Sequence, residues 1–227
     1  MQKSGIENLK SDIKDICSKA GRNSNDVTII AASKYTDAKG ITEALELGIN
    51  NFGENRADAL TEKFALVGNK ATWHFIGHLQ SRKAKAVVSI AEYIHSCDSL
   101  DIIKEINNQA SAISKLQKVL IEVNISGEES KYGLQPQGLP GLVKSALGFK
   151  NIRVCGLMTM APLCEDEILI RQIFKDLRLL RDKTVKEIRD YTDNLTLSEL
   201  SMGMSNDYKI AIEEGATMVR IGSLIFL

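Results

Sequence analysis

Eight short apolar runs alternate with amphipathic helical segments along almost the whole chain. The runs have the length of buried strands and cover residues 27–33, 50–53, 72–77, 93–97, 118–124, 153–160, 196–201 and 217–222. The helical segments repeat apolar residues at the helical period and cover residues 37–48, 56–68, 81–90, 99–113, 138–149, 165–190 and 206–215. Because strands separated by helices pair in parallel, this order predicts a parallel sheet covered by helices.

Eight strand and helix units are the number that closes into a (β/α)8 barrel, the TIM-barrel class. A doubly wound open sheet is the alternative, but no G-x-G-x-x-G sequence follows the first strand. No linker interrupts the chain, so we predict a single domain over residues 1–227. An extra helix is expected before the first strand. Its apolar positions at helical spacing are Ile6, Leu9, Ile13, Ile16 and Cys17.

The composition favours a soluble protein of the cytoplasm. Lys and Arg number 29, as do Asp and Glu, so no net charge favours binding to nucleic acid. No apolar stretch reaches the about 18 residues that a membrane helix needs. The N-terminal segment mixes charged with apolar residues and therefore differs from a secretory signal.

The spacing of cysteine and histidine argues against a metal site. The four cysteines form no C-x-x-C pair, and they are expected to be reduced and mostly buried. His74 and His78 form an H-x-x-x-H pair, but Gly77 interrupts it and no glutamate follows the first histidine. Two roles stay open for His74, Trp73 and Gln80, which could line a pocket or pack structurally.

Lys34 stands at the end of the first predicted strand, where the active site of a (β/α)8 barrel lies. A lysine in that position is either a solvated surface residue or, when crowded by apolar groups and dipoles, an amine suited to imine formation. Asn55 and Arg56 follow the second strand, and Asn55 suits the N-cap of a helix over residues 55–66.

Two further strand ends combine glycine with hydroxyl residues just before helical or apolar segments. One is SMGMSND (201–207), which contains Ser205, and the other is RIGS (220–223), which contains Gly222 and Ser223. Backbone N–H groups at such turns bind phosphate, and the loops after strands seven and eight are its usual position in this barrel class. Each sequence alone fits a plain turn, but together they predict a phosphate site.

Lys34 is predicted to lie beside this phosphate site, because the first strand of a closed barrel pairs with the eighth. An amine next to a phosphate site suggests pyridoxal 5′-phosphate, whose aldehyde forms an imine with lysine. Arg220 would point into the barrel if Val219 and Ile221 point outward, and its guanidinium could then contact the ring nitrogen of the cofactor.

Six segments at the strand ends are together specific enough to identify a family. They are AASK (31–34), FGENR (52–56), WHFIGHLQSRK (73–83), VNISGEESKYG (123–133), GLMTM (156–160) and SMGMSNDYKIAIEEGATMVRIGSLIF (201–226). This set resembles the pyridoxal phosphate homeostasis proteins across nearly the whole chain. One difference is that the family usually continues with glycine after IF, whereas Leu227 stands there in this chain.

The resemblance implies a monomeric barrel, similar to the N-terminal domain of alanine racemase, that holds pyridoxal phosphate as an imine on its lysine. It implies phosphate contacts from the two hydroxyl-bearing turns and a ring-nitrogen contact from the arginine of strand eight. The cofactor-binding residues that it implies are Lys34, Asn55, Met158, Ser205, Arg220, Gly222 and Ser223.

The expected function is the storage, delivery or buffering of pyridoxal phosphate, with cofactor-dependent apo-enzymes as recipients. A weak amino-acid racemase is the alternative, since an imine on Lys34 would acidify the α-proton of an amino acid. The racemases that resemble this barrel take a second base from an additional domain, for which the sequence offers no residues after strand eight. A third hypothesis is a barrel that binds another phosphorylated metabolite and uses Lys34 only for its charge.

Overall fold

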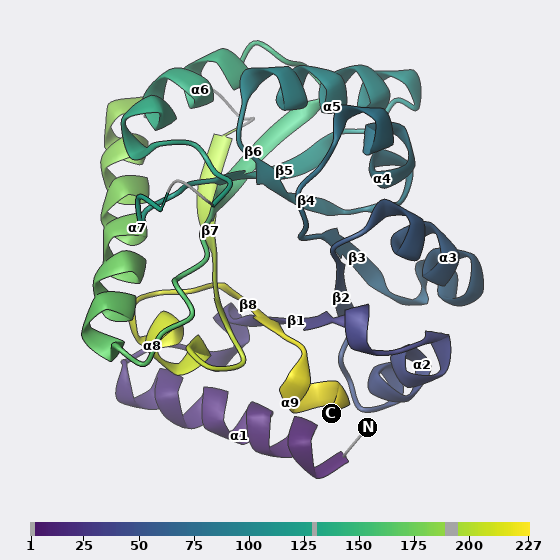
Figure 1. Cartoon of the computed structure of the whole chain (residues 1–227), viewed down its shortest axis with the longest axis vertical. Helices are drawn as coiled ribbons and strands as arrows, with labels where there is room; N and C mark the ends of the chain where they lie inside the picture. The colour runs from purple at the N-terminus through teal and green to yellow at the C-terminus, as the bar shows by residue number, and fades with distance from the viewer. Residues whose placement is uncertain (1–2, 129–130, 189–194) are drawn as a thin grey trace.

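Eight parallel strands form a closed barrel in the computed structural model, which describes residues 3–128, 131–188 and 195–227. Each strand pairs with the next in chain order, and β8 closes the barrel on β1 (Figure 1). The strands are β1 (Thr28–Ala32), β2 (Asn51–Glu54), β3 (Thr72–Phe75), β4 (Tyr93–Cys97), β5 (Gln117–Glu122), β6 (Ile152–Met158), β7 (Leu195–Met204) and β8 (Met218–Ile221). The predicted (β/α)8 barrel is confirmed, and each predicted strand overlaps an observed one.

Helices surround the barrel. They are α1 (Lys3–Lys19), α2 (Ala38–Glu46), α3 (Ala57–Val67), α4 (Ala84–Ile90), α5 (Leu100–Ala112), α6 (Leu139–Ala146), α7 (Glu167–Ile188), α8 (Tyr208–Glu213) and α9 (Ser223–Phe226). The expected N-terminal helix is α1, which lies along α8 and α9 (Figure 1). The helix expected over residues 165–190 begins at Glu167, and its last two predicted residues lie outside the described part. None of the helices in that part is long and apolar enough to cross a membrane.

The strands bury side chains on both faces, as the period of two along a strand requires. The outward face packs against the helices, where Val219 and Ile221 of β8 are fully buried. The inward face forms a separate small cluster inside the barrel, made of Ile30, Leu120, Cys155, Met158 and Met218. Arg220 lies between Val219 and Ile221 on β8 and therefore points into the barrel, as the sequence predicted.

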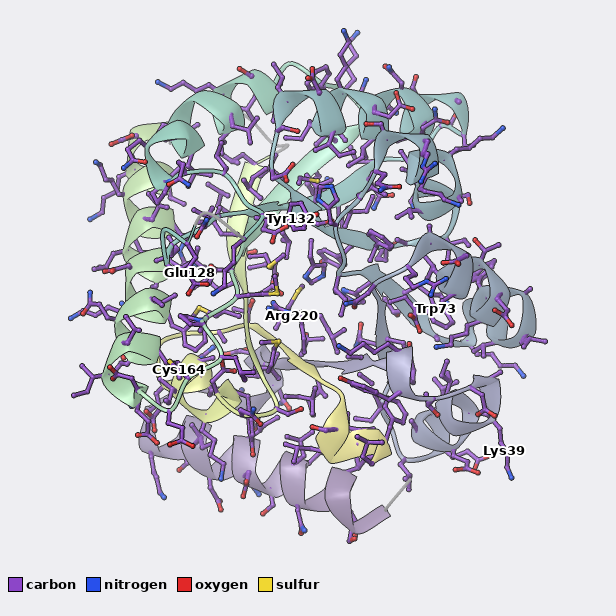
Figure 2. All side chains as sticks on the ribbon, viewed as in Figure 1. Lys39, Trp73, Glu128, Tyr132, Cys164 and Arg220 are labelled. Carbon is purple, nitrogen blue, oxygen red and sulfur yellow. The ribbon has the colours of Figure 1, made fainter. Side chains whose placement is uncertain are left out.

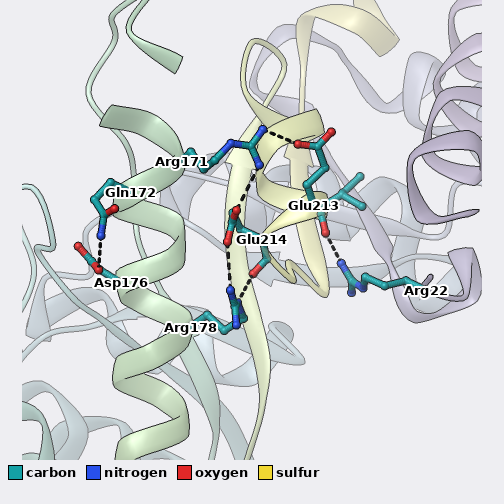
Figure 3. Close-up of polar contacts among 8 residues, drawn as sticks. Arg22, Arg171, Gln172, Asp176, Arg178, Glu213 and Glu214 are labelled. Atoms are coloured by element: carbon teal, nitrogen blue, oxygen red, sulfur yellow. Dashed lines mark hydrogen bonds and ion pairs between the residues drawn. The ribbon is translucent and has the colours of Figure 1, made fainter. Parts of the chain in front are cut away.

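Ion pairs and backbone contacts fasten the helices next to β8, which carries part of the site. Arg171 and Arg178 of α7 both reach Glu214, and Arg171 also reaches Glu213 (Figure 3). Arg22, which follows α1, donates to the backbone oxygens of Ile212 and Ala216. Exposed ion pairs contribute little stability singly, so the contacts to backbone oxygens matter more for the position of α8.

Candidate functional site

A cavity of about 250 Å³ lies at the C-terminal end of the barrel strands. Its walls come from the segments after β1, β2, β3, β6, β7 and β8. The structure brings six of the seven predicted site residues into this lining: Lys34, Asn55, Ser205, Arg220, Gly222 and Ser223. Residues almost 190 positions apart in the chain thus meet here because β1 pairs with β8.

Met158 is the predicted site residue that does not line the cavity. It ends β6 and is buried inside the barrel with Ile30 and Leu120. Met160, two residues further along the chain, lines the cavity instead. Side chains two apart in a strand share a face, so Met158 lies on the same inward face, and its contact with the cofactor stays a prediction.

Lys34 sits in a single turn of 3-10 helix, Ser33–Tyr35, that follows β1 directly. Its side chain is exposed at the lip of the cavity, and its Nζ lies 4.8 Å from the centre of the Tyr35 ring. The sequence left open whether Lys34 is a solvated surface residue or an amine in the site. In the structure its side chain contacts solvent and also lines the cavity.

A buried clamp holds the turn that carries Lys34. The Ser33 hydroxyl donates to Glu54 Oε1 at 2.7 Å, and Lys63 Nζ donates to the Ser33 backbone oxygen at 2.6 Å. Lys63 also forms an ion pair with Glu54, whose side chain is 1% exposed. Removing either Lys63 or Glu54 would leave the other as a buried charge without a partner, so the pair is expected to stay formed. Both side chains also bond to Ser33 and thereby fix the backbone next to Lys34.

Asn55 lines the cavity but does not cap a helix, so that part of the sequence prediction was wrong. The N-cap of α3 is Arg56, whose side chain instead binds Asp58. The backbone of Asn55 packs against Gly77, where a Cβ atom would lie 2.2 Å from the Asn55 oxygen. This close approach holds Asn55 at the mouth of the barrel.

Ser205 and Gly222 lie face to face across the cavity wall. The Gly222 amide donates to Ser205 Oγ at 3.4 Å, and a Cβ atom on Gly222 would lie 3.0 Å from the Tyr35 ring. Asp207 holds the loop before α8, because its carboxylate accepts from the Met204 amide. Burial raises the pKa of Asp207, while the Met204 amide and Arg220 act against that rise. A hydroxyl and a backbone amide that lie together in this way can both donate to a phosphate oxygen.

Arg220 projects from β8 into the barrel and reaches the cavity from below. Its Nη1 donates to Ser201 Oγ at 2.6 Å, and its Nη2 donates to the Thr159 backbone oxygen at 3.0 Å. Burial lowers the pKa of Arg220 to about 10, against the pull of Asp207 and Glu122, so the guanidinium is charged at neutral pH. Its hydrogen-bond acceptors here are neutral oxygens.

The other polar candidates have structural positions. Trp73 is buried and donates to the Gly68 oxygen, and Gln80 is exposed and accepts from Arg82. His74 is buried inside the barrel, and none of these three side chains lines the cavity. In the described ranges, no three His, Cys, Asp or Glu residues come together as ligands of a metal ion would. The cysteines are unpaired and, apart from Cys164, buried, as expected.

Several residues of the cavity were not anticipated. Tyr35, Ile76 and Asp207 line it beside Met160. Tyr35 and Asp207 stand next to predicted site residues in the chain, so proximity in sequence is a signal that could have found them. Cys164 lies at the outer edge, away from Arg220, which is central in the barrel (Figure 2).

Glu122 ends β5 inside the barrel and is 4% exposed. Burial and the nearby Asp98 raise its pKa to about 7, while Arg220 acts to lower it. The folded protein therefore holds a proton on Glu122 between its ordinary pKa of 4.5 and about 7, where the unfolded chain has lost it. The stability that this proton contributes is present at low pH and is lost as the pH rises through 7.

Replacing Glu122 with glutamine should remove this pH dependence. Between pH 5 and pH 8 the free energy of unfolding of the wild type should fall relative to that of Glu122→Gln by about 2 kcal/mol. Urea unfolding at pH 5 and at pH 8 measures this difference in free energy. The control is Glu62→Gln, at an exposed position of α3. Parallel pH profiles for the wild type and Glu122→Gln would show that this carboxyl titrates normally.

The chain matches the family model described as "Alanine racemase, N-terminal domain" over residues 6–227. Proteins named "Pyridoxal phosphate homeostasis protein" match it over nearly their full length. The one from Aquifex aeolicus is 41% identical over 215 residues, covering 94% of this chain and 92% of its own. The one from Escherichia coli K12 is 35% identical over 225 residues, covering 97% and 94%.

Solved structures agree with these sequence matches. PipY of Synechococcus elongatus, solved with PLP bound, has a TM-score of 0.83 and 30% identity, with 95% of this chain and 100% of that chain covered. A protein of unknown function from Bifidobacterium adolescentis has a TM-score of 0.92 and 34% identity, with 99% and 94% covered. An alanine racemase from Clostridium difficile has a TM-score of 0.74 at 13% identity, which shows a shared fold.

Proposed function

This chain belongs to the family of pyridoxal phosphate homeostasis proteins, and from this premise we propose that it binds pyridoxal 5′-phosphate and holds it for intracellular storage, buffering or delivery. The observation that carries the proposal is the meeting of one amine, one phosphate-type cradle and one buried arginine in the same cavity. Lys34, the pair Ser205 and Gly222, and Arg220 supply these three parts.

The residues present fit this cofactor. Lys34 would form the imine, its Nζ bonding to the aldehyde carbon with loss of water. The Ser205 hydroxyl and the amides of Gly222 and Ser223 would bind the phosphate group. Gly222 also allows the Tyr35 ring to lie close to its backbone, since a Cβ atom there would meet that ring. When bound, the cofactor supplies an electron sink for carbanion chemistry.

Arg220 favours holding the cofactor over using it in broad catalysis. A guanidinium donates hydrogen bonds but does not give up a proton. Placed at the ring nitrogen, it would leave that nitrogen unprotonated and weaken the electron sink. The weaker electron sink favours a carrier over a racemase, which relies on that sink to acidify the α-proton of its substrate.

The test is borohydride reduction of the protein after addition of pyridoxal phosphate, followed by peptide mapping. We expect an absorption band in the visible range that borohydride removes, and a single modified peptide that contains Lys34. Incubation of the loaded protein with single enantiomers of several amino acids should leave their configuration unchanged. A protein that gains no band would instead favour another phosphorylated metabolite, and rapid racemisation would favour the enzyme.

Replacing Ser205 with alanine should weaken cofactor binding while the imine still forms. One lost hydrogen bond to a charged phosphate group corresponds to about 1–3 kcal/mol of binding free energy. Titration followed by fluorescence or absorption measures the change. Ser126→Ala provides a control, because Ser126 lies after β5 and outside the cavity lining. Unchanged affinity in Ser205→Ala would argue that the loop after β7 does not face the phosphate.

A further inference from the structure

A chain of hydrogen bonds crosses the inside of the barrel and ends on Arg220. From Arg220 Nη1 it runs to Ser201 Oγ at 2.6 Å, and from there to His95 Nδ1 at 2.9 Å. His95 Nε2 lies 3.0 Å from His74 Nδ1, and His74 Nε2 lies 3.1 Å from Asn51 Oδ1. Side chains of β8, β7, β4, β3 and β2 are thereby joined in one line.

The two imidazoles in this series of hydrogen bonds, those of His74 and His95, are neutral. Burial lowers the pKa of His74 to about 3, with Lys118 acting in the same direction. Burial also lowers the pKa of His95 well below its usual value, and the positive charge of Arg220 adds to that effect. A neutral imidazole has one donor and one acceptor nitrogen. Once one ring nitrogen of a histidine is known to donate, the other must accept, so the direction of one hydrogen bond determines that of the next.

The direction of the chain follows from its two ends. Asn51 Oδ1 accepts, so His74 Nε2 carries the proton and His74 Nδ1 accepts from His95 Nε2. His95 Nδ1 is then an acceptor and must receive the hydroxyl proton of Ser201. The Ser201 oxygen is left free to accept from Arg220, which can only donate. With the Asn51 oxygen as the acceptor, each bond in the series has one direction.

We propose that Ser201, supported by His95 and His74, is a positioning residue for Arg220 in the cofactor site. The second anchor is the Thr159 backbone oxygen, and together the two contacts fix the plane of the guanidinium. Ser201 presents an uncharged oxygen in place of a carboxylate, so the arginine keeps its positive charge for the cavity. This inference rests on the proposed function, because it assigns Arg220 to the ring nitrogen of pyridoxal phosphate.

A purely structural role does not account well for this arrangement. Apolar side chains such as Ile30 and Leu120 form a cluster in the interior of the same barrel. Apolar residues of the same shape could replace a buried polar chain at little cost in stability. Ser201 and His95 are fully buried, and the hydrogen bonds that they form lead to Arg220, a buried cation in the cavity lining.

The experiment compares Ser201→Ala with Ser96→Ala, a buried serine on β4 whose hydroxyl has no hydrogen-bond partner among the described residues. In the protein without cofactor, nitrogen NMR should show both His74 and His95 as the Nε2–H tautomer, with His95 altered in Ser201→Ala alone. With cofactor, Ser201→Ala should bind about tenfold more weakly and should move the absorption maximum of the bound cofactor. Ser96→Ala should do neither.

Loss of thermal stability in Ser201→Ala, with unchanged affinity and absorption, would overturn the positioning role. If Ser201→Ala does not fold, Ser201→Thr and Ser201→Val make the same comparison, since they match in shape and differ in the hydroxyl. Recovery of the wild-type spectrum in Ser201→Thr alone supports the proposal, and equal spectra for both overturn it. A wild-type protein that binds no pyridoxal phosphate would refute the proposed function itself, which the control measurement detects before any variant is compared.

Discussion

Replacing Lys34 with alanine is expected to abolish the covalent bond to pyridoxal phosphate while fold and phosphate binding persist. Lys34 is exposed and fills no part of the core, so the free energy of unfolding should change by less than about 0.5 kcal/mol. The visible absorption band should disappear, and borohydride should trap no cofactor on the protein. Mass spectrometry of the reduced protein and a competition assay with inorganic phosphate measure the two effects separately.

Lys39→Ala is the matched control for Lys34→Ala. Lys39 lies on the outside of α2, well away from Arg220 at the centre of the barrel (Figure 2). The control should keep the band at full strength. Cofactor still trapped in Lys34→Ala would move the imine to another amine, and Lys39 and Lys131 are then the first positions to map.

Strand order and side-chain direction could be read from the sequence because both follow from local periodicity. Alternation along TMVRIG places Val219 and Ile221 on one face and Arg220 on the other, whatever else the chain does. The closure of β8 on β1 then brings Arg220, Gly222 and Lys34 to one end of the barrel. These parts of the site follow from the barrel itself.

Features that depend on contacts between distant segments could not be read in this way. Asn55 is a residue type that often caps helices. In the structure its backbone instead packs closely against Gly77, more than twenty residues away in the chain. The clamp on the Lys34 turn needs Glu54 from β2 and Lys63 from α3. Neither residue carries a local signal, because each looks like an ordinary charged residue.

The histidines show the same limit. His74 and His78 have a spacing that two ligands on one helix turn would have, yet His74 points into the barrel and His78 stacks on Tyr132. The hydrogen-bond partners of His74 are His95, on the neighbouring strand β4, and Asn51, on β2. Which side chains meet across two strands depends on the register of their pairing, and that register cannot be read from the spacing of residues along one strand. The series of hydrogen bonds from Arg220 to Asn51 could therefore be found only from the structure.

Replacing Arg220 with glutamate should have the largest effect on the chemistry of the bound cofactor. A carboxylate at the ring nitrogen would accept a hydrogen bond from it and so favour its protonated form. Arg220 acts to lower the pKa of Glu122 and of Asp207, so its loss favours the protonated forms of both carboxyls and leaves the new glutamate as the group that acts on the ring. We expect a shifted absorption maximum and a faster transamination of added amino acids, because a protonated ring is the stronger electron sink. Absorption spectra across pH and assays for keto acid measure both.

The stability of Arg220→Glu should fall, because Ser201 Oγ and the Thr159 oxygen each lose their donor, at a cost of about 1–3 kcal/mol for each oxygen. Arg220→Gln separates the two effects: its amide can still donate to one of these oxygens, but it brings no carboxylate to the ring. It should share the loss of stability in part and leave the ring unprotonated. An absorption spectrum that is identical in Arg220→Glu and the wild type, with cofactor bound to both, would show that Arg220 only joins β8 to β6 and β7. The argument for a carrier at this position would then fail, because the charge of the arginine would have no influence on the ring.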